Sequence, residues 1–132
     1  MANITVKNLK ITSESDKEGE VCFISFTFSI ECDRAEQVLS EANLLKFEIR
    51  ASIMGYDDWF DDHLRDLPTD AIYYRCGDGD INVGPVVISC STLDEDFGED
   101  EIYVKVTATS VGSPGGSEYT VEGSSSSVTV NY

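Results

Sequence analysis

Strict alternation between positions 22 and 32 is the feature that most restricts how this chain can fold. The odd positions from 25 to 31 are polar, and the even positions are all apolar: Cys22, Ile24, Phe26, Phe28, Ile30 and Cys32. Successive side chains of a β-strand point to opposite faces. The alternation therefore predicts a long strand with one buried face and one solvated face.

The same period of two recurs along the rest of the chain. Shorter alternating runs occupy 4–11, 45–53, 72–76, 86–90, 102–108 and 128–130, and turn-forming Gly, Asp, Ser and Pro separate them. A length of 132 residues suits one domain with its own core. We therefore expect a single all-β domain over 1–132, built as a two-sheet antiparallel sandwich of seven to eight strands.

One segment departs from this pattern and predicts a short helix over about 33–45. Apolar residues recur there at helical spacing, at Val38, Leu39, Ala42 and Leu45. Asp33 stands where an N-cap would accept hydrogen bonds from the first turn. We expect this helix to cover one end of the sandwich, with binding of a partner as its alternative role.

The last part of the chain resembles a known family. The run from Val104 to Ser110, the Gly/Pro/Ser-rich loop after it and the run from Ser127 to Val130 resemble the last two strands of fibronectin type III and related immunoglobulin-like domains. The resemblance implies an immunoglobulin-like sandwich. It brings no functional residues with it, because this architecture supports many unrelated functions.

Four cysteines lie in the alternating runs, with no C-x-x-C spacing. Cys22 and Cys32 share one predicted strand and would be roughly 33 Å apart, too far to bond each other. We expect four buried free thiols that act as small apolar side chains. The alternative is one disulfide between Cys76 and Cys90, and the single histidine, His63, gives no spacing for a zinc site.

The charge balance excludes some partners. Nine Lys and Arg against twenty-five Asp and Glu give a net charge of −16, which repels nucleic acids and anionic lipids. The N-terminus lacks the pattern of a signal peptide, and no apolar stretch reaches the roughly 20 residues of a membrane span. We therefore expect no nucleic acid and no membrane as partners, and a location in the cytoplasm or in an assembled particle.

Carboxylates in the predicted loops offer a candidate calcium site. Hard oxygen ligands, roughly six to eight of them, are what Ca²⁺ requires, and the candidates are Asp78, Asp80, Asn82, Asp94 and Asp96. The D-x-D-x-N start is that of an EF-hand, but Val83 replaces its glycine and Ser89 its glutamate. The alternative is a solvated acidic surface, with no cofactor at all.

Aromatic residues beside these acids are candidates for contact with a partner protein or a sugar: Tyr56, Trp59, Phe60 and Tyr73. Exposed aromatic rings can stack on sugars or anchor a protein. The alternative is that Trp59 and Phe60 close one end of the core.

The sequence shows no arrangement typical of an enzyme. It lacks a G-x-S-x-G motif and a glycine loop for phosphate. We expect a non-enzymatic structural or protein–protein interaction domain that assembles with itself or with another protein, and a basic protein is a candidate partner. A virion, an injection machine and a toxin-neutralising complex are suitable settings. The alternative is a ligand-binding module for calcium or carbohydrate.

Overall fold

The computed structural model describes the chain apart from residues 17–18, 56–61, 69–71, 93–99, 113–117 and 131–132. The described part holds nine strands, one α-helix and one 3-10 turn. In chain order these are β1 (Asn3–Asp16), β2 (Gly19–Glu31), α1 (Arg34–Glu41), β3 (Lys46–Gly55), β4 (Asp62–Asp66), β5 (Tyr73–Tyr74), β6 (Ile81–Ser89), η1 (Cys90–Thr92), β7 (Asp100–Val111), β8 (Thr120–Ser124) and β9 (Val128–Val130).

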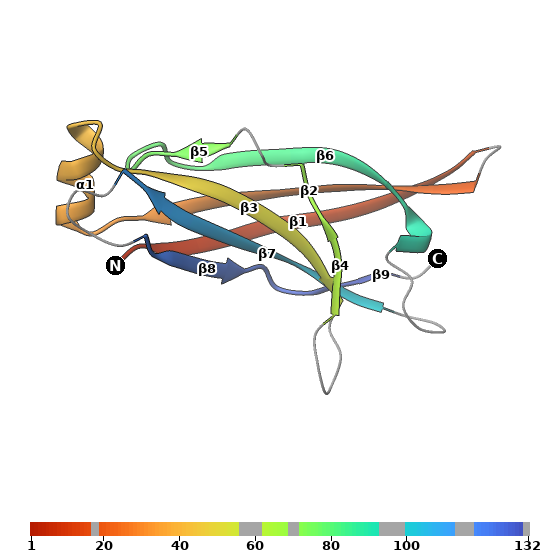
Figure 1. Ribbon diagram of the computed structural model, residues 1–132. Helices are drawn as coiled ribbons and strands as arrows, with labels where there is room; N and C mark the ends of the chain where they lie inside the picture. The colour runs from red at the N-terminus through yellow and green to blue at the C-terminus, as the bar shows by residue number, and fades with distance from the viewer. Residues whose placement is uncertain (17–18, 56–61, 69–71, 93–99, 113–117, 131–132) are drawn as a thin grey trace.

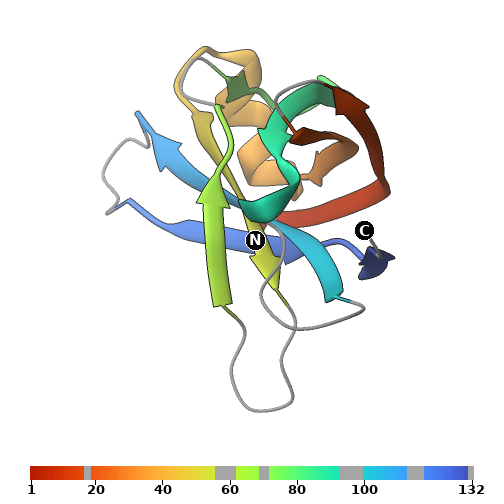
Figure 2. The ribbon, with the colours of Figure 1, turned by 90° about the vertical axis from the view of Figure 1, so that its right-hand side faces the viewer.

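The strands form two antiparallel sheets. One sheet has the order β1-β2-β6, and the other has the order β4-β3-β7-β8, with β5 paired to β3 and β9 paired to β7. Figure 1 shows α1 at one end of the two sheets, and Figure 2 shows them from the opposite end, with β3, β4 and β7 on one side and β1, β2 and β6 on the other. The expected all-β architecture with two antiparallel sheets and one helix is confirmed.

The buried face of β2 lies where the alternation predicts it. Phe28 is fully buried and Phe26 is 2% exposed. Their neighbours on the same face, Cys22, Ile24 and Ile30, are buried as well. This face packs in one core with the inward residues of β3 and β7, which include Phe47, Ile49, Ile53, Ile102, Val104 and Val106. The inward row of β2 thus joins the two sheets.

The four cysteines form two disulfides, so the expectation of four free thiols is wrong, and so is the alternative of a Cys76–Cys90 bond. Cys22 bonds Cys90, with Cα atoms 5.1 Å apart, and Cys32 bonds Cys76, with Cα atoms 5.9 Å apart. The reason is strand order. Because β6 runs antiparallel beside β2, the residue after β6 lies near the start of β2, and residues before β6 lie near its end.

The helix is shorter than the predicted 33–45. Asp33 is its N-cap, and its side chain accepts a hydrogen bond from the Glu36 N–H while Glu36 reaches back to the Asp33 N–H, a capping box. The helix ends at Ala42 because Asn43 takes a positive φ of 60°. The N–H groups of Asn43 and Leu44 then bond the carbonyls of Ser40 and Leu39, the Schellman pattern that closes a helix.

Two strands lie where the sequence predicts none. β4 lies in the stretch 56–70, for which the sequence predicts a longer connection or a short helical turn, and β8 precedes the expected last strand. Neither contains a fully buried side chain among its described residues, so neither carries the apolar alternation by which the other strands are recognised.

We expect Phe28→Ala to lower the free energy of unfolding by about 3–5 kcal/mol, because it removes a buried ring and leaves a cavity between the sheets. Urea denaturation followed by circular dichroism measures the change. Val87→Ala is the control: Val87 is 56% exposed, so its effect should stay within about 0.5 kcal/mol. A loss below about 1 kcal/mol for Phe28→Ala would contradict the assignment of this face to the core.

Candidate functional site

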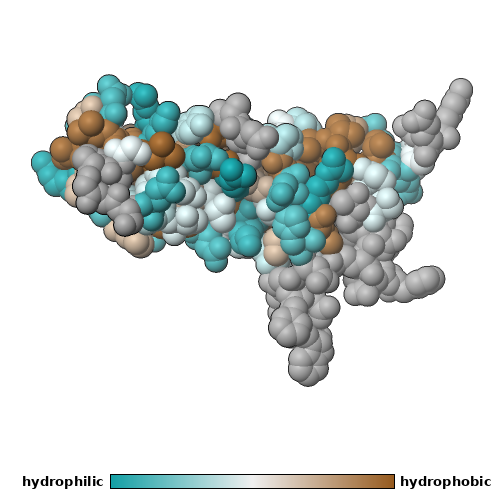
Figure 3. All heavy atoms as spheres, viewed as in Figure 1, coloured by the Kyte–Doolittle hydropathy of each residue, from teal (hydrophilic) through white to brown (hydrophobic). Residues whose placement is uncertain are grey.

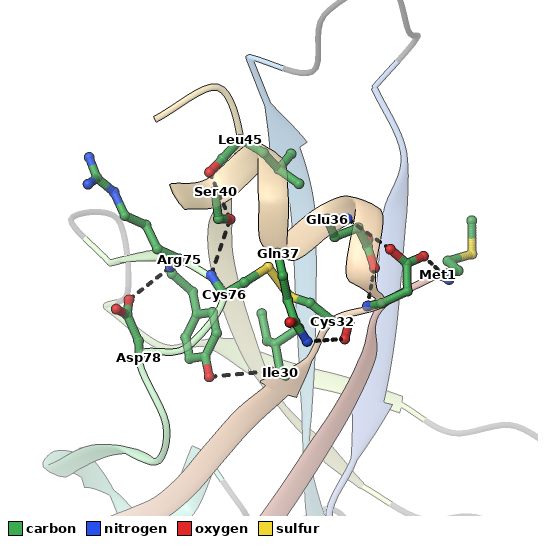
Figure 4. Close-up of a disulfide and its surroundings, with 12 residues drawn as sticks. Met1, Ile30, Cys32, Glu36, Gln37, Ser40, Leu45, Arg75, Cys76 and Asp78 are labelled. Carbon is green, nitrogen blue, oxygen red and sulfur yellow. Dashed lines mark hydrogen bonds and ion pairs between the residues drawn. A yellow bond between two sulfur atoms is a disulfide. The ribbon is translucent and has the colours of Figure 1, made fainter. Parts of the chain in front are cut away.

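The helix end of the sandwich brings together residues that are far apart in the sequence. Figure 4 shows α1, the end of β2 and the β5–β6 connection meeting around the Cys32–Cys76 disulfide. The buried Ser40 hydroxyl donates to the Leu45 carbonyl at 3.1 Å and accepts from the Cys76 N–H at 3.3 Å. One covalent bond and one hydrogen bond therefore fix the helix end against the strand connection, and the other hydrogen bond fixes α1 against the residue before β3.

The β5–β6 connection is fixed by Tyr74 and Asp78. The buried Tyr74 hydroxyl lies 2.9 Å from the Gly79 carbonyl and 3.3 Å from the Ile30 carbonyl, and its ring lies against Phe28 with centroids 5.9 Å apart. The Asp78 carboxylate accepts from the Arg75 N–H at 2.8 Å. These contacts hold the turn that presents Tyr73 and Arg75.

A buried carboxylate connects the first turn of α1 to the segment before β8. Glu36 is 6% exposed, and it accepts a hydrogen bond of 2.6 Å from the Tyr119 hydroxyl. Burial and this hydrogen bond to Glu36 raise the pKa of Tyr119 far above its usual range. Tyr119 therefore stays a neutral donor to Glu36 at physiological pH.

Two large apolar side chains are exposed beside two cations at this end. Leu44 is 47% exposed and Tyr73 is 49% exposed. The Lys46 ammonium lies over the Tyr73 ring, 4.4 Å from its centroid, and the Arg75 guanidinium donates to the Asn43 side-chain oxygen at 2.7 Å. We call Leu44, Lys46, Tyr73 and Arg75 the helix-end surface.

A shallow hollow lies within the helix-end surface. Its volume is about 190 Å³, and it is lined by Asn43, Leu44, Leu45, Lys46, Arg75, Val111 and Gly112. Gly112 has a φ of +79°, and a Cβ there would press on the Leu44 carbonyl oxygen at 3.2 Å. The hollow is open to solvent.

The predicted calcium ligands within the described residues point to separate partners. Asp78 closes its own turn, the Asp80 carboxylate pairs with the Lys7 ammonium at 2.9 Å, and the Asn82 side-chain oxygen accepts from the Thr27 hydroxyl at 2.7 Å. Asp94 and Asp96 lie outside the described residues. In the part of the chain that the structure describes, no three His, Cys, Asp or Glu side chains are grouped to hold a metal ion.

Of the four predicted contact aromatics, the structure describes Tyr73 alone, because Tyr56, Trp59 and Phe60 fall outside the described residues.

Sequence reasoning missed the other three members of the helix-end surface. Leu44 lay inside the predicted helix, and only the early end of α1 at Ala42 leaves it exposed. Lys46 begins β3 and Arg75 follows β5, and no sequence pattern joins them.

No protein-family model matches this chain, and no curated protein matches it. Among the described residues, no helix combines the length and the apolar character needed to cross a bilayer.

Replacing Cys32 and Cys76 together by serine should lower the free energy of unfolding by about 2–4 kcal/mol. The bond closes a loop across 44 positions of sequence, and its loss gives the unfolded chain more conformational freedom. Urea titration gives the value. The same pair replaced by alanine controls for side-chain polarity and should show a similar loss, whereas a loss below about 0.5 kcal/mol in both would contradict a stabilising bond.

We expect calcium to stabilise the protein no more than sodium chloride does at matched ionic strength. Salt relieves the self-repulsion of a chain with a net charge of −16, whereas a specific site would add roughly 2.7 kcal/mol at a hundredfold excess of Ca²⁺ over Kd. Thermal melts in the two salts compare these cases. A saturable, calcium-specific rise that Asp78→Ala with Asp80→Ala abolishes, and Asp16→Ala preserves, would show the calcium site instead.

Proposed function

We propose that this protein is a non-enzymatic protein–protein interaction domain that works as a component of a larger assembly. The observation that carries the proposal is the helix-end surface, where Leu44 and Tyr73 are each about half exposed and Leu44, Lys46 and Arg75 line a hollow. Exposed aromatic and aliphatic residues at a concave site are typical anchors of protein interfaces.

The surroundings of this surface suit an interface. The Cys32–Cys76 bond and the Ser40 hydrogen bonds hold the elements beneath it, so little conformational freedom would be lost on binding. A tyrosine side chain has few rotamers to lose when a partner binds, and the Lys46 ammonium already restricts the Tyr73 ring. An apolar anchor from the partner would fill the hollow and cover Leu44.

The charge of the chain favours a basic partner. A net charge of −16 attracts proteins of opposite sign over several ångströms and raises their association rate at low salt. The helix-end surface itself carries Lys46 and Arg75, which contact Tyr73 and Asn43. The proposed partner is thus positive overall and docks through an apolar residue.

An immunoglobulin-like topology is part of the proposal, and strand order supports it. The pairing β1-β2-β6 corresponds to strands A, B and E of such domains, and β3-β7-β8 corresponds to C, F and G. The resemblance of the last strands to fibronectin type III domains points to the same arrangement. This architecture supports many unrelated functions, so the proposed binding role rests on the helix-end surface and not on the fold.

The disulfides bear on where the domain works. Two bonds, Cys22–Cys90 and Cys32–Cys76, form and persist in oxidising surroundings. They favour an exported or particle-associated setting over the cytoplasm, which free thiols would have suited. A virion or injection machine, or a complex that neutralises a basic toxin, provides such a setting.

Panning the domain against a displayed library of random peptides tests the proposal. We expect selected peptides with an apolar anchor and a net positive charge, and a binding constant that Tyr73→Ala weakens at least about tenfold, as removal of an interface anchor does. Fluorescence anisotropy measures Kd for each variant. Leu44→Ser should act in the same direction.

Val87→Ala is the control, because Val87 is an exposed apolar residue like Leu44 and Tyr73 but lies on β6. It should leave the peptide affinity unchanged. Peptides that bind the Tyr73→Ala and Leu44→Ser variants as well as the wild type would place the interface elsewhere. Absence of any saturable binding would contradict an interaction domain of this kind.

A further inference from the structure

β6 forms a free edge of the three-stranded sheet. In the part of the chain that the structure describes, β6 pairs with β2 alone, and no backbone hydrogen bond joins its other side to another element. The backbone groups on that side can pair with an added strand. This edge is on the opposite sheet from β3, where Lys46 belongs to the helix-end surface.

The edge lacks the charges that usually block such pairing. β6 has the sequence INVGPVVIS, without any ionisable side chain, in a chain where 25 of 132 residues are acidic. Natural edge strands commonly carry lysine, proline or a bulge as protection. Pro85 and the register shift opposite Ile24 and Phe26 protect the middle of β6, which leaves Val86 to Ser89 as an unprotected run.

An apolar row on the outer face leads to this run. Val87 is 56% exposed and lies directly opposite Phe23 of β2, which is half-buried although it is on the solvated face. Figure 3 shows hydrophobic atoms gathered over the C-terminal half of β6. This apolar row therefore reaches the open edge of the sheet, and no described strand continues it beyond β6.

A second copy of the chain is the occupant that fits this edge best. Antiparallel pairing of β6 with β6 of another copy is a two-fold contact in which one strand meets its own sequence. Neither strand brings a charge to the pair, and Val87 of one copy can lie beside Val87 of the other, with Phe23 one strand further from the contact in each copy. The pairing thereby joins the outer apolar rows of the two copies into one continuous row.

We propose that two copies associate through Val86–Ser89 of β6 to form one continuous sheet across the dimer. This rests on the proposed function, because it names self-association as one contact within the assembly, at a surface separate from the helix-end surface. Each copy has a net charge of −16, so the two repel each other at long range. Dimerisation should therefore strengthen as salt rises, the opposite of binding to a basic partner.

Sedimentation equilibrium of the full chain in low salt and in about 0.5 M NaCl, where charges are screened beyond about 4 Å, tests the proposal. We expect a reversible monomer–dimer equilibrium that the higher salt strengthens. Val87→Lys should raise the dimer Kd at least about tenfold, because it places two like charges opposite each other at the edge. Ser89→Lys is a second variant at the same edge and should act likewise.

Val38→Lys is the matched control, with the same change of residue and charge at a position of nearly equal exposure on α1, 54% against 56%. It should dimerise as the wild type does, and circular dichroism melts should show all three variants folded. A wild type that stays monomeric in both salts, or equal dimerisation of Val87→Lys and Val38→Lys, would overturn the proposal. Peptide binding that persists in those cases would leave the proposed function standing, so the two failures are distinguishable.

Discussion

The inward row of β2 joins the two sheets, and the rest of the molecule depends on it. Ile24, Phe26 and Phe28 fill the space between the sheets, and both ends of the strand are fixed covalently, by Cys22 to the residue after β6 and by Cys32 to the β5–β6 connection. A burial of this kind supplies most of the free energy that holds a sandwich together. The disulfides add to it by restricting the unfolded chain.

This anchoring of β2 determines the geometry of the helix end. Cys32 directly precedes the N-cap Asp33, so the start of α1 is held within two residues of a disulfide. The Schellman closure at Asn43 then turns the chain into β3, which leaves Leu44 exposed while Leu45 enters the core. The exposed apolar surface thus follows from where the helix must end.

Sequence reasoning recovers what depends on local pattern. Alternation identifies the buried face of β2, and Asp33 marks the start of the helix. Local pattern does not predict the disulfides, because pairing Cys22 with Cys90 requires knowing that β6 lies beside β2. Comparing which face the cysteines occupy along one strand, or on strands that follow each other in the sequence, pairs cysteines that do not bond.

The candidate site shows the same limit. Tyr73 is recognisable as an aromatic residue in an acidic region, but Lys46 reaches it only because β5 pairs with β3. Asp78, Asp80 and Asn82 have the spacing of calcium ligands, whereas their contacts with Arg75, Lys7 and Thr27 come from three different parts of the fold. Spacing identifies candidate ligands, and tertiary contacts decide which way they point.

Mapping of the disulfides tests the central role of β2 most directly. The protein is alkylated under denaturing conditions without reductant, digested at acidic pH and examined by mass spectrometry. Linked peptides containing Cys22 with Cys90 and Cys32 with Cys76, and no alkylated cysteine, are the predicted result. Four alkylated cysteines, or a peptide linking Cys76 with Cys90, would contradict a β2 strand anchored at both ends.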